Sequence, residues 1–474
     1  MSKIYKYFIG GKRTGSSGTV SVRNPYSGKE ICKVYKTSPA DIEKTAEFAK
    51  KGFEATKKLP SHKRSEILKN IAEGIKNNSE DLSKTLALEA GKPIKFAAGE
   101  VDRAVLTFTI ASEETKRICG EFIDLDLNAV SENRYGIVKR FPMGPILAIS
   151  PFNFPLNLVA HKIAPAIAAG NSFVLKPASA TPVTALKLGE IILESGYPEQ
   201  AVNIIVCPGS QAEILVGNDA FKLISFTGSA EVGWKLKSTA GKKVVVLELG
   251  GNAGVIVEDD ADIDFAVKRC VLGGFVYAGQ VCISVQRIFV NKNIFKEFKD
   301  KFIKEVSAVK VGDPLNENVI LSSMIDEYSA KNTEKWVNEA VSEGAEILTG
   351  GKRKGSIYYP TVLTNTKAEM KVRKEEVFAP LVTLESYDTF EDAVSLVDEG
   401  VYGLQAGIFT NDIKKIWYAY ENIEVGGLII NDFPTYRIDH MPYGGVKDSG
   451  LGREGLKYAI QEMTEPKLLA LNLG

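Results

Sequence analysis

The sequence predicts an α/β fold in which helices cover both faces of largely parallel sheets. Short apolar runs bounded by Gly, Pro or Ser alternate with helix-length segments over residues 145–247, and a second alternation occupies residues 254–431. Such continuous apolar runs indicate strands that are buried on both faces, as in parallel sheets. The chain has 474 residues, which exceeds the ~250–300 residues at which a single core stops growing. We therefore expect two or three structural units.

The first hundred residues are predicted to be mainly helical after a short β-like start. Residues 38–41 read Ser-Pro-Ala-Asp, the pattern of a capping box with Pro at the first helical position. A further amphipathic helix is expected over residues 62–89, with a break near residues 77–79. Another is expected over residues 98–117.

The two alternations define the expected strands. In the first, strands are expected at residues 145–150, 172–175, 202–206, 222–226 and 244–247, and helices at residues 181–195 and 230–238. In the second, strands are expected at residues 288–290, 345–348, 381–387, 406–409 and 427–430. Residues 133–140 resemble a hairpin arm that belongs to neither unit. Ligands of parallel sheets bind at the carboxyl ends of the strands, so the residues after each run are candidate functional residues.

The composition indicates a globular protein and excludes several classes of function. Lys plus Arg equals Asp plus Glu at 59 each, so the zero net charge provides no attraction to nucleic acid or anionic lipid. The five cysteines include no Cys-x-x-Cys pair, and the three histidines are too scattered for a cluster, so we expect neither a disulfide scaffold nor a metal site.

The most apolar stretch, residues 144–160, is interrupted by Pro and Asn, so it does not predict a membrane-spanning helix. The N-terminus lacks the apolar core of a signal peptide. We therefore expect a cytoplasmic protein with no membrane partner.

Cys282 is the candidate nucleophile. It follows a predicted helix that ends near Tyr277, lies in a Gly-bearing turn and precedes a predicted strand. A turn of this kind can expose a thiol and direct backbone N–H groups at an oxyanion. Free cysteines are more often buried and inert, and that is the interpretation for the others: Cys32, Cys119, Cys207 and Cys270.

Two further polar side chains lie in apolar surroundings. Glu248 directly follows the run at residues 244–247, where it is either a paired structural charge or a general base with a raised pKa. Asn153 either satisfies a local turn or donates its amide to a developing oxyanion.

Two strand-to-helix turns suggest a nucleotide. Gly228-Ser229 lies between an apolar run and a predicted helix, whose free N–H groups and positive dipole end suit a pyrophosphate. The pattern is not Gly-x-Gly-x-x-Gly, and strand–Gly–helix turns are common. Lys176 also follows a strand, where the alternative is a solvated lysine in an ordinary turn.

Taken together, these motifs resemble the aldehyde dehydrogenase superfamily, in family order across almost the whole chain. The matching segments are Pro-Phe-Asn-Phe-Pro (151–155), Lys-Pro-Ala (176–178), Phe-Thr-Gly-Ser (226–229), Leu-Glu-Leu-Gly-Gly (247–251), Gly-Gln-Val-Cys (279–282), Glu-Glu-Val-Phe-Ala-Pro (375–380) and Pro-Tyr-Gly-Gly (442–445). The chain departs from the family pattern at Phe152, where many members have Trp, and at Ala379, where Gly is usual.

The resemblance implies a Rossmann-like NAD(P)-binding domain, an α/β catalytic domain and a small β oligomerisation arm. The first would comprise residues 1–120 and 143–251, and the second residues 252–445. The arm and tail would comprise residues 121–142 and 446–474. Family members are usually homodimers or homotetramers in which the arm adds a strand to a neighbour's sheet, and we expect the same here.

The resemblance also implies a reaction. The Cys282 thiolate would attack an aldehyde, and the Asn153 amide and the Cys282 N–H would hold the thiohemiacetal oxyanion. Hydride transfer to the nicotinamide would leave a thioester, which Glu248 would hydrolyse by activating water. Relatives that acylate coenzyme A often lack this glutamate, so we expect hydrolysis to the carboxylic acid.

By the same resemblance, Lys176 falls where the family binds the adenosine ribose and Glu376 where it binds the nicotinamide ribose. Ser179 replaces a glutamate that is frequent in NAD-preferring members, which favours NADP, with NAD as the alternative. The remaining predicted cofactor contacts are Ser150, Pro151, Phe152, Gly209, Thr227, Gly228, Ser229, Leu249 and Phe378.

Within the superfamily, the chain looks most like archaeal-type lactaldehyde and glyceraldehyde dehydrogenases, so the expected substrate is a small hydroxyaldehyde. Val281 stands where members that act on anionic aldehydes often carry Arg, which argues against a strongly anionic substrate. Arg437 is the candidate substrate residue, and its alternative is a surface or interface ion pair. The alternative activities are succinate-semialdehyde and non-phosphorylating glyceraldehyde-3-phosphate dehydrogenase. An alternative of another class is a catalytically silent structural homologue.

Overall fold

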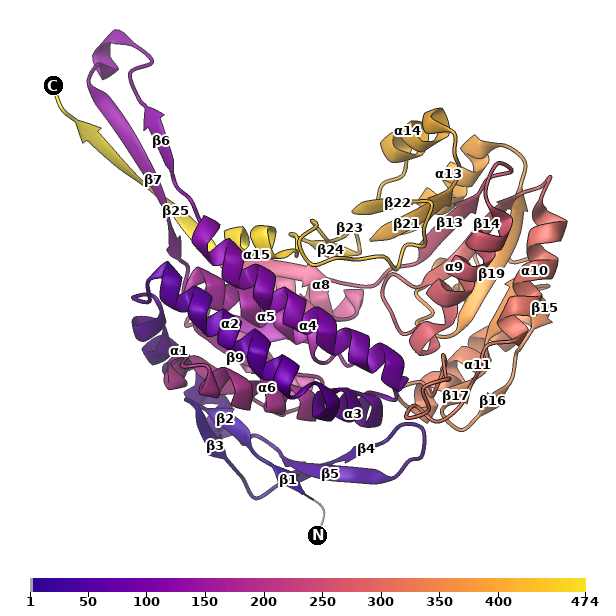
Figure 1. Ribbon diagram of the computed structural model, residues 1–474, viewed down its shortest axis with the longest axis horizontal. Coiled ribbons are helices and arrows are strands. Elements are labelled where there is room, and N and C mark those ends of the chain that lie inside the picture. The colour runs from indigo at the N-terminus through magenta and orange to yellow at the C-terminus, as the bar shows by residue number, and fades with distance from the viewer. Residues whose placement is uncertain (1–2) are drawn as a thin grey trace.

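Two large sheets and a projecting three-stranded arm make up the fold, as the computed structural model shows for residues 3–474 (Figure 1). One sheet has eight strands and the other has seven, and each has its own layers of helices. Among residues 3–474, no helix is both long enough and apolar enough to cross a membrane.

The eight-stranded sheet contains the first predicted alternation. Its five central strands run parallel, whereas the strands at both edges pair antiparallel. In spatial order the strands are β24 (Gly450–Leu451), β12 (Val244–Glu248), β11 (Leu223–Thr227), β8 (Ile146–Ile149), β9 (Phe173–Lys176), β10 (Val202–Ile204), β2 (Tyr7–Ile9) and β3 (Lys12–Thr14).

Helices cover this sheet in two layers on one side. Every residue of α5 (Asn157–Ala169) is buried, because α5 packs on the sheet and is itself covered by other helices. Those outer helices are α2 (Ser61–Asn77), α4 (Ile94–Glu114) and α15 (Leu456–Glu462). The remaining helices of this unit are α1 (Pro39–Thr56), α3 (Ser79–Ala90), α6 (Val183–Glu194), α7 (Gly209–Val216) and α8 (Ala230–Thr239), with short 3-10 turns at η1 (Thr115–Arg117) and η3 (Glu199–Ala201). A further 3-10 turn, η2 (Ala129–Ser131), lies in the arm.

The seven-stranded sheet contains the second alternation. All its strands run parallel except one antiparallel edge strand, β15. In spatial order they are β15 (Glu346–Thr349), β18 (Thr361–Thr364), β19 (Leu381–Tyr387), β14 (Val285–Asn291), β13 (Ala253–Val257), β21 (Gln405–Phe409) and β22 (Gly427–Ile430). Its helices are α9 (Ile263–Phe275), η4 (Val276–Gly279), α10 (Phe295–Ser307), α11 (Glu327–Ser342), α12 (Lys371–Lys374), α13 (Phe390–Asp398) and α14 (Ile413–Asn422).

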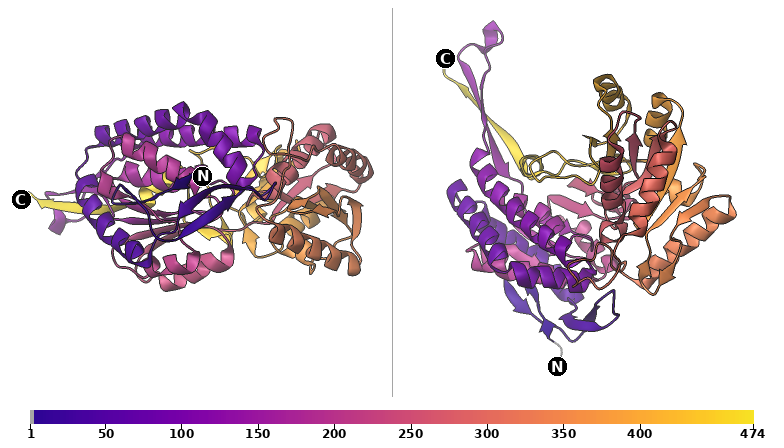
Figure 2. Two further views of the ribbon diagram at one scale, coloured as in Figure 1. Left: turned by 90° about the horizontal axis from the view of Figure 1, so that it is seen from below. Right: turned by 45° about the vertical axis from the view of Figure 1, so that its right-hand side comes forward.

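The arm consists of β6 (Glu121–Asp124), β7 (Arg134–Pro142) and β25 (Thr464–Asn472). β25 pairs with β7 along its full length, and both views of Figure 2 show the arm and the C-terminus extending away from the body. Small sheets complete the chain: β1 (Ile4–Tyr5) with β5 (Glu30–Tyr35) and β4 (Thr19–Arg23), β16 (Arg353–Lys354) with β17 (Ile357–Tyr358), and β20 (Tyr402–Gly403) with β23 (Val446–Lys447).

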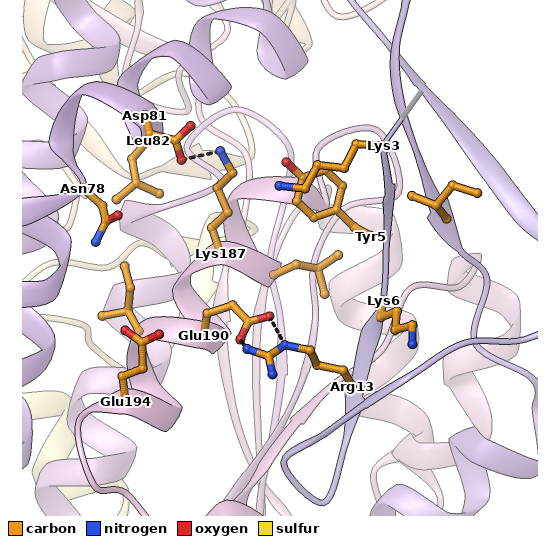
Figure 3. A pocket seen from close by; sticks show the side chains of 13 residues that line it. Lys3, Tyr5, Lys6, Arg13, Asn78, Asp81, Leu82, Lys187, Glu190 and Glu194 are labelled. Carbon is orange, nitrogen blue, oxygen red and sulfur yellow. Dashed lines mark hydrogen bonds and ion pairs between the residues drawn. The ribbon is translucent and has the colours of Figure 1, made fainter. Parts of the chain in front are cut away.

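Two ion pairs join α6 to its neighbours, one to the N-terminal strand β3 and one to α3. They line a groove of about 410 Å³, in which Lys187 of α6 points toward Asp81 of α3 at 2.5 Å and Arg13 of β3 points toward Glu190 (Figure 3). Cations and carboxylates both line this groove, and the two ion pairs tie α6 to α3 and β3.

The expected fold class is confirmed, with local differences. The expected break in the helix over 62–89 separates α2 from α3 at Asn78. Only half of the expected capping box forms: Ser38 accepts from the Asp41 N–H, whereas the Asp41 carboxylate accepts from the Tyr7 hydroxyl. β13 is not among the predicted strands, because only a short Gly-rich link separates it from β12 in the other sheet.

Candidate active site

The predicted site residues of the first unit lie at the carboxyl ends of the central strands of the eight-stranded sheet. β8, β9, β11 and β12 are neighbours, and in their register Ile149 lies opposite Lys176 and Thr227 lies opposite Glu248. The segments that begin at Ser150, Lys176 and Thr227 therefore leave the sheet side by side. Parallel sheets bind their ligands at these carboxyl ends.

Cys282 reaches the same place from the other unit. After α9 ends, Tyr277, Ala278 and Gly279 all adopt positive φ angles of 53°, 54° and 66°. Such left-handed backbone is costly for residues with a Cβ, so tertiary packing holds this turn in place. A Cβ on Gly279 would lie 2.2 Å from the Ala379 carbonyl oxygen, which is why the turn requires glycine there.

The side chain of Cys282 lies between two cavities of about 250 Å³ each. We call the first the Glu376 cavity, which is lined by Pro151, Phe152, Asn153, Leu158, Thr227, Gly228, Ser229, Leu249, Gly250, Cys282, Glu376 and Phe378. We call the second the Arg437 cavity; it also contains Cys282 and is mostly apolar, with Arg103, His161 and Arg437 as its ionisable side chains besides Cys282 and Tyr443. One thiol is thus accessible from two separate chambers.

Asn153 lies against the Cys282 turn. Its amide nitrogen donates to the Gln280 carbonyl at 2.9 Å, and its buried Oδ1 has no partner within residues 3–474. An amide nitrogen carries two hydrogens, so one remains for another acceptor. The arrangement can direct an N–H group toward an oxygen bound at the Cys282 sulfur.

Glu248 is the last residue of β12 and is buried without a hydrogen bond to either carboxylate oxygen within residues 3–474. Burial and then the charge of Glu454 raise the pKa of Glu248 well above its usual value. A carboxyl group with a raised pKa and free lone pairs can take a proton from water at neutral pH.

Glu376 lines the cavity that is named after it. Its carboxylate accepts from the Gly251 N–H at 3.1 Å, and a Cβ on Gly250 would lie only 2.4 Å from its Oε2. Burial raises the pKa of Glu376 to about 7, partly offset by the hydrogen bond from Gly251. Phe378 contacts Phe152 edge-on, with ring centroids 5.9 Å apart.

The other predicted cofactor residues lie outside the Glu376 cavity at neighbouring strand ends. Ser179 donates to the Cys207 carbonyl at 3.2 Å, which brings it to the turn before Gly209 at the start of α7. Lys176 is buried and donates to the Pro177 carbonyl at 3.2 Å, so it is not the solvated lysine of the alternative interpretation. The buried Ser150 hydroxyl has no partner within residues 3–474.

Arg437 is in the interior, so the interpretation as a surface ion pair is wrong. Only 6% of its side chain is exposed, and it donates to Glu454 at 2.9 Å. His161 Nδ1 lies 2.9 Å from Arg437, and His161 Nε2 lies 2.9 Å from Asp439. Arg103, whose side chain is partly exposed, donates to Asp439 at 2.8 Å.

Arg437 belongs to a buried ionic cluster that the sequence does not predict; its other members are Arg103, His161, Lys162, Asp439 and Glu454. Burial would raise the pKa of Glu454, but Lys162, His161 and Arg437 hold that pKa well below its usual range. Lys162 also donates to Thr227 at 2.6 Å, which links the cluster to the strand end beside Glu248. His161 and Lys162 are neighbours on α5, but no local pattern joins them to Arg103, Asp439 and Glu454, which lie far away in the sequence.

Tyr443 was recognised only as part of a motif, yet it contacts the thiol. Its hydroxyl lies 3.2 Å from the Cys282 sulfur, and its ring faces the Arg437 guanidinium at 3.6 Å. Burial raises the pKa of Cys282 to about 12, while the Tyr443 hydroxyl has the opposite, smaller effect.

Comparison with known proteins gives a consistent assignment. The sequence profile of the aldehyde dehydrogenase family matches residues 12–469. The chain is 43% identical over 472 residues to 3-sulfolactaldehyde dehydrogenase of Priestia megaterium, covering 99% of this chain and 98% of that protein. It is 41% identical over 470 residues to lactaldehyde dehydrogenase of Methanocaldococcus jannaschii, covering 98% and 100%.

Solved structures agree over nearly the full length. Aldehyde dehydrogenase 21 from Physcomitrella patens, in complex with the reaction product succinate, superimposes with a TM-score of 0.97 at 45% identity and covers 100% of this chain and 99% of that one. Glyceraldehyde-3-phosphate dehydrogenase GapN from Methanocaldococcus jannaschii, complexed with NADP, gives a TM-score of 0.92 at 41% identity and covers 96% and 99%.

The contact between Tyr443 and Cys282 makes a prediction about thiol reactivity. At pH values below the pKa of Cys282, the alkylation rate is proportional to the small thiolate fraction, so it should rise steadily up to pH 10 without a plateau. Tyr443→Phe removes a hydrogen bond of ~1.5 kcal/mol to the charged form, which raises the pKa by about one unit and slows alkylation at fixed pH by roughly tenfold.

The measurement is iodoacetamide alkylation of the cofactor-free protein, in a Cys119→Ser background because Cys119 is exposed. Tyr418→Phe, an exposed tyrosine of α14, serves as the control. A plateau below pH 8, or an unchanged rate in Tyr443→Phe, would contradict this account of the thiol.

Proposed function

Because the chain belongs to the aldehyde dehydrogenase family and oxidises aldehydes with NAD(P), we propose that its substrate is a small hydroxyaldehyde of the glyceraldehyde or lactaldehyde type. The observation that carries this proposal is the position of Cys282 between the two cavities. A nucleophile accessible from both sides can meet an aldehyde in one chamber and a cofactor ring in the other. The Arg437 cavity, at about 250 Å³, suits a small substrate.

We propose the following roles for the chain's own residues. Cys282 attacks the aldehyde carbon as thiolate, and the Asn153 amide and the Cys282 N–H donate to the resulting oxyanion. A nicotinamide held by the residues of the Glu376 cavity would supply the hydride acceptor, and loss of the hydride would convert the thiohemiacetal on Cys282 to a thioester. Glu248 then takes a proton from the water that hydrolyses this thioester, and the carboxylic acid leaves.

The residues of the Glu376 cavity fit a nicotinamide nucleotide. Gly228 and Gly250 have no side chain there, and Glu376 is a partly buried carboxylate that can accept from ribose hydroxyls. The partnerless buried oxygens of Ser150 and Asn153 at this edge supply further polar contacts. Lys176, Ser179 and Gly209 would line the continuation toward the adenosine.

We further propose that NADP is preferred. Ser179 is small and neutral, so it does not repel a 2′-phosphate, and Lys176 is the last residue of β9, just before the turn that carries Ser179. GapN from Methanocaldococcus jannaschii, a relative over nearly the full length, was crystallised with NADP.

A second candidate substrate, an aldehyde with an anionic group, is favoured by a specific observation. Arg103 and Arg437 both line the substrate cavity, and the buried Nε of each has no partner within residues 3–474. An acceptor oxygen on the substrate, either hydroxyl or anionic, would satisfy these donors. Two relatives agree with an anionic substrate: one is named for sulfolactaldehyde, and the other was crystallised with succinate.

The proposed assembly is a homodimer or homotetramer in the cytoplasm. The arm exposes a group of apolar side chains that a second copy would cover, namely Phe122, Ile123, Leu127, Val130, Ile137, Leu468, Leu469 and Leu473. β22 is an edge strand of the seven-stranded sheet and could accept a strand from a partner's arm. The proposed domain limits remain 1–120 with 143–251, 252–445, and 121–142 with 446–474.

Glu248→Gln should separate the two halves of the reaction. Acylation of Cys282 still releases about one equivalent of NADPH per site in a burst, but later turnover falls by ~10²–10⁴-fold because the general base is lost. Stopped-flow absorbance at 340 nm with glyceraldehyde measures both phases. Cys282→Ala should give neither, and residual turnover in that variant would refute the proposed nucleophile.

Arg103→Met should distinguish the two substrate classes. If an anionic group binds at this end, losing one charged donor raises KM for succinate semialdehyde or glyceraldehyde 3-phosphate by about 10–100-fold, and leaves KM for lactaldehyde within about threefold. Steady-state assays with all three aldehydes and both cofactors provide the measurement. Equal changes for all three would exclude a specific role in anion binding.

Ser179→Glu should reverse the cofactor preference. A carboxylate near the 2′-phosphate costs enough to lower kcat/KM for NADP by roughly tenfold or more, while kcat/KM for NAD is retained or rises. Ser179→Gln, of similar size but neutral, is the matched control. If Gln and Glu have the same effect, size rather than charge decides the preference.

Leu468→Asp should weaken the assembly. A charge in the apolar contact shifts the sedimentation coefficient to a smaller species at the same protein concentration. Tyr328→Asp alters a more exposed hydrophobic residue on α11 and should leave the assembly unchanged. A purified chain that sediments as a monomer before mutation would refute the proposed dimer or tetramer.

A further inference from the structure

A buried ion pair outside both cavities contacts the two segments that carry Asn153 and Cys282. Lys92 lies in the short link between α3 and α4, and Glu100 lies on α4. Their side chains are 1% and 0% exposed and form a direct, short hydrogen bond. Neither residue lines the Glu376 cavity or the Arg437 cavity.

Glu100 fixes the segment that begins α5. Its Oε1 accepts from the backbone N–H groups of Leu156 and Asn157 at 2.9 and 3.0 Å. A carboxylate at a helix N-terminus satisfies N–H groups that have no partner in the helix and is stabilised by the helix dipole. Asn153 lies only a few residues before these groups in the same loop, so Glu100 sets where that loop leaves the helix.

Lys92 contacts that loop and the Cys282 turn together. Its Nζ lies 3.6 Å from the ring centroid of Phe154 and 4.5 Å from that of Tyr277. The two rings contact each other edge-on at 6.3 Å. A cation held between two aromatic faces, away from water, attracts both.

Tyr277 is the first residue of the left-handed turn that leads to Cys282. Its hydroxyl donates to the Ala90 carbonyl at 3.1 Å, next to the link that carries Lys92. The strained turn is thereby held from the α3–α4 side. Phe154, directly after Asn153, is held by the same ammonium group.

We propose that the Lys92–Glu100 pair is a positioning device that sets the distance between the Asn153 amide and the Cys282 sulfur. The inference deepens the proposed function and rests on the oxyanion role of Asn153. Asn153 already contacts the Cys282 turn through Gln280, so a shift of either segment changes the same gap. A shift of ~1 Å in such a gap costs up to about 10²-fold in rate.

A contribution to stability does not by itself explain why this ion pair is buried. Replacing a buried pair with apolar residues is often neutral or stabilising, so such pairs are weak evidence of a stabilising role. The contacts instead go to the two catalytic segments: both Glu100 oxygens and the Lys92 ammonium are used either between themselves or on residues 154–157 and 277.

A double-mutant cycle tests the inference. Asn153→Ala should lower kcat by ~10²–10³-fold, because it removes one oxyanion donor. Lys92→Met keeps the side-chain length without the charge and should lower kcat by about 10–100-fold. In the Asn153→Ala background, Lys92→Met should lower kcat by no more than about threefold, because residues that act through one contact are not additive.

Two other measurements separate positioning from general damage. The NADP dissociation constant of Lys92→Met, from fluorescence titration, should stay within about twofold of the unmutated enzyme, since the pair does not line the Glu376 cavity. Lys415→Met breaks another ion pair, with the buried Glu258, at a distance from both cavities. This control should lower the melting temperature and leave kcat unchanged.

If Lys92→Met does not yield folded protein, Glu100→Gln is taken through the same cycle. It keeps an acceptor for Leu156 and Asn157 but removes the counter-charge of Lys92, so a loss in kcat of at least about fivefold is expected. Equal losses with and without Asn153, or a kcat within twofold of the unmutated enzyme, would overturn the positioning role. An unchanged kcat in Asn153→Ala would instead contradict the proposed function.

Discussion

The close approach of two backbone segments is the constraint on which the rest of the site depends. The link between β12 and β13 connects the two sheets, and the turn before β14 carries Cys282. A Cβ on Gly251 would lie 2.3 Å from the Cys282 carbonyl oxygen, so only glycine allows this contact. The same link follows Glu248, and the Gly251 N–H binds Glu376. Gly250 and Gly251 thereby set the relative positions of the proposed nucleophile Cys282, the proposed base Glu248 and the Glu376 carboxylate.

Burial gives these groups their electrostatic character. Glu248 and Glu454 are buried carboxyl groups close enough to interact, and their pKa values move apart: that of Glu248 rises and that of Glu454 falls. The pKa of Glu454 is the lower of the two because the cations Arg437 and Lys162 both contact its carboxylate. The two carboxyl groups thus differ in proton affinity, and the raised pKa of Glu248 suits a general base.

Much of the fold and the central residues of the site were predictable from the sequence. Short apolar strands ending in polar residues led to Glu248, Lys176 and Thr227, because strand ends converge in a parallel sheet. Cys282 was predictable from its turn and motif. Its partly buried position between the two cavities was not, because the groups that surround it come from both units.

Long-range pairs explain most of what the sequence could not give. His161 and Asp439 are 278 residues apart, and Tyr443 and Cys282 are 161 apart. No periodicity records such contacts, since each partner looks like an ordinary polar residue in its own element. Lys92 and Glu100 are close in sequence, but their contacts with Phe154 and Tyr277 appear only in three dimensions.

The most direct test of the account is a crystal structure of Glu248→Gln soaked with NADP and glyceraldehyde. The account predicts an acyl group on the Cys282 sulfur in the Arg437 cavity, with its carbonyl oxygen at about 3 Å from Asn153 Nδ2 and the Cys282 backbone nitrogen. An acyl group on another residue, or a carbonyl oxygen directed away from Asn153, would contradict it.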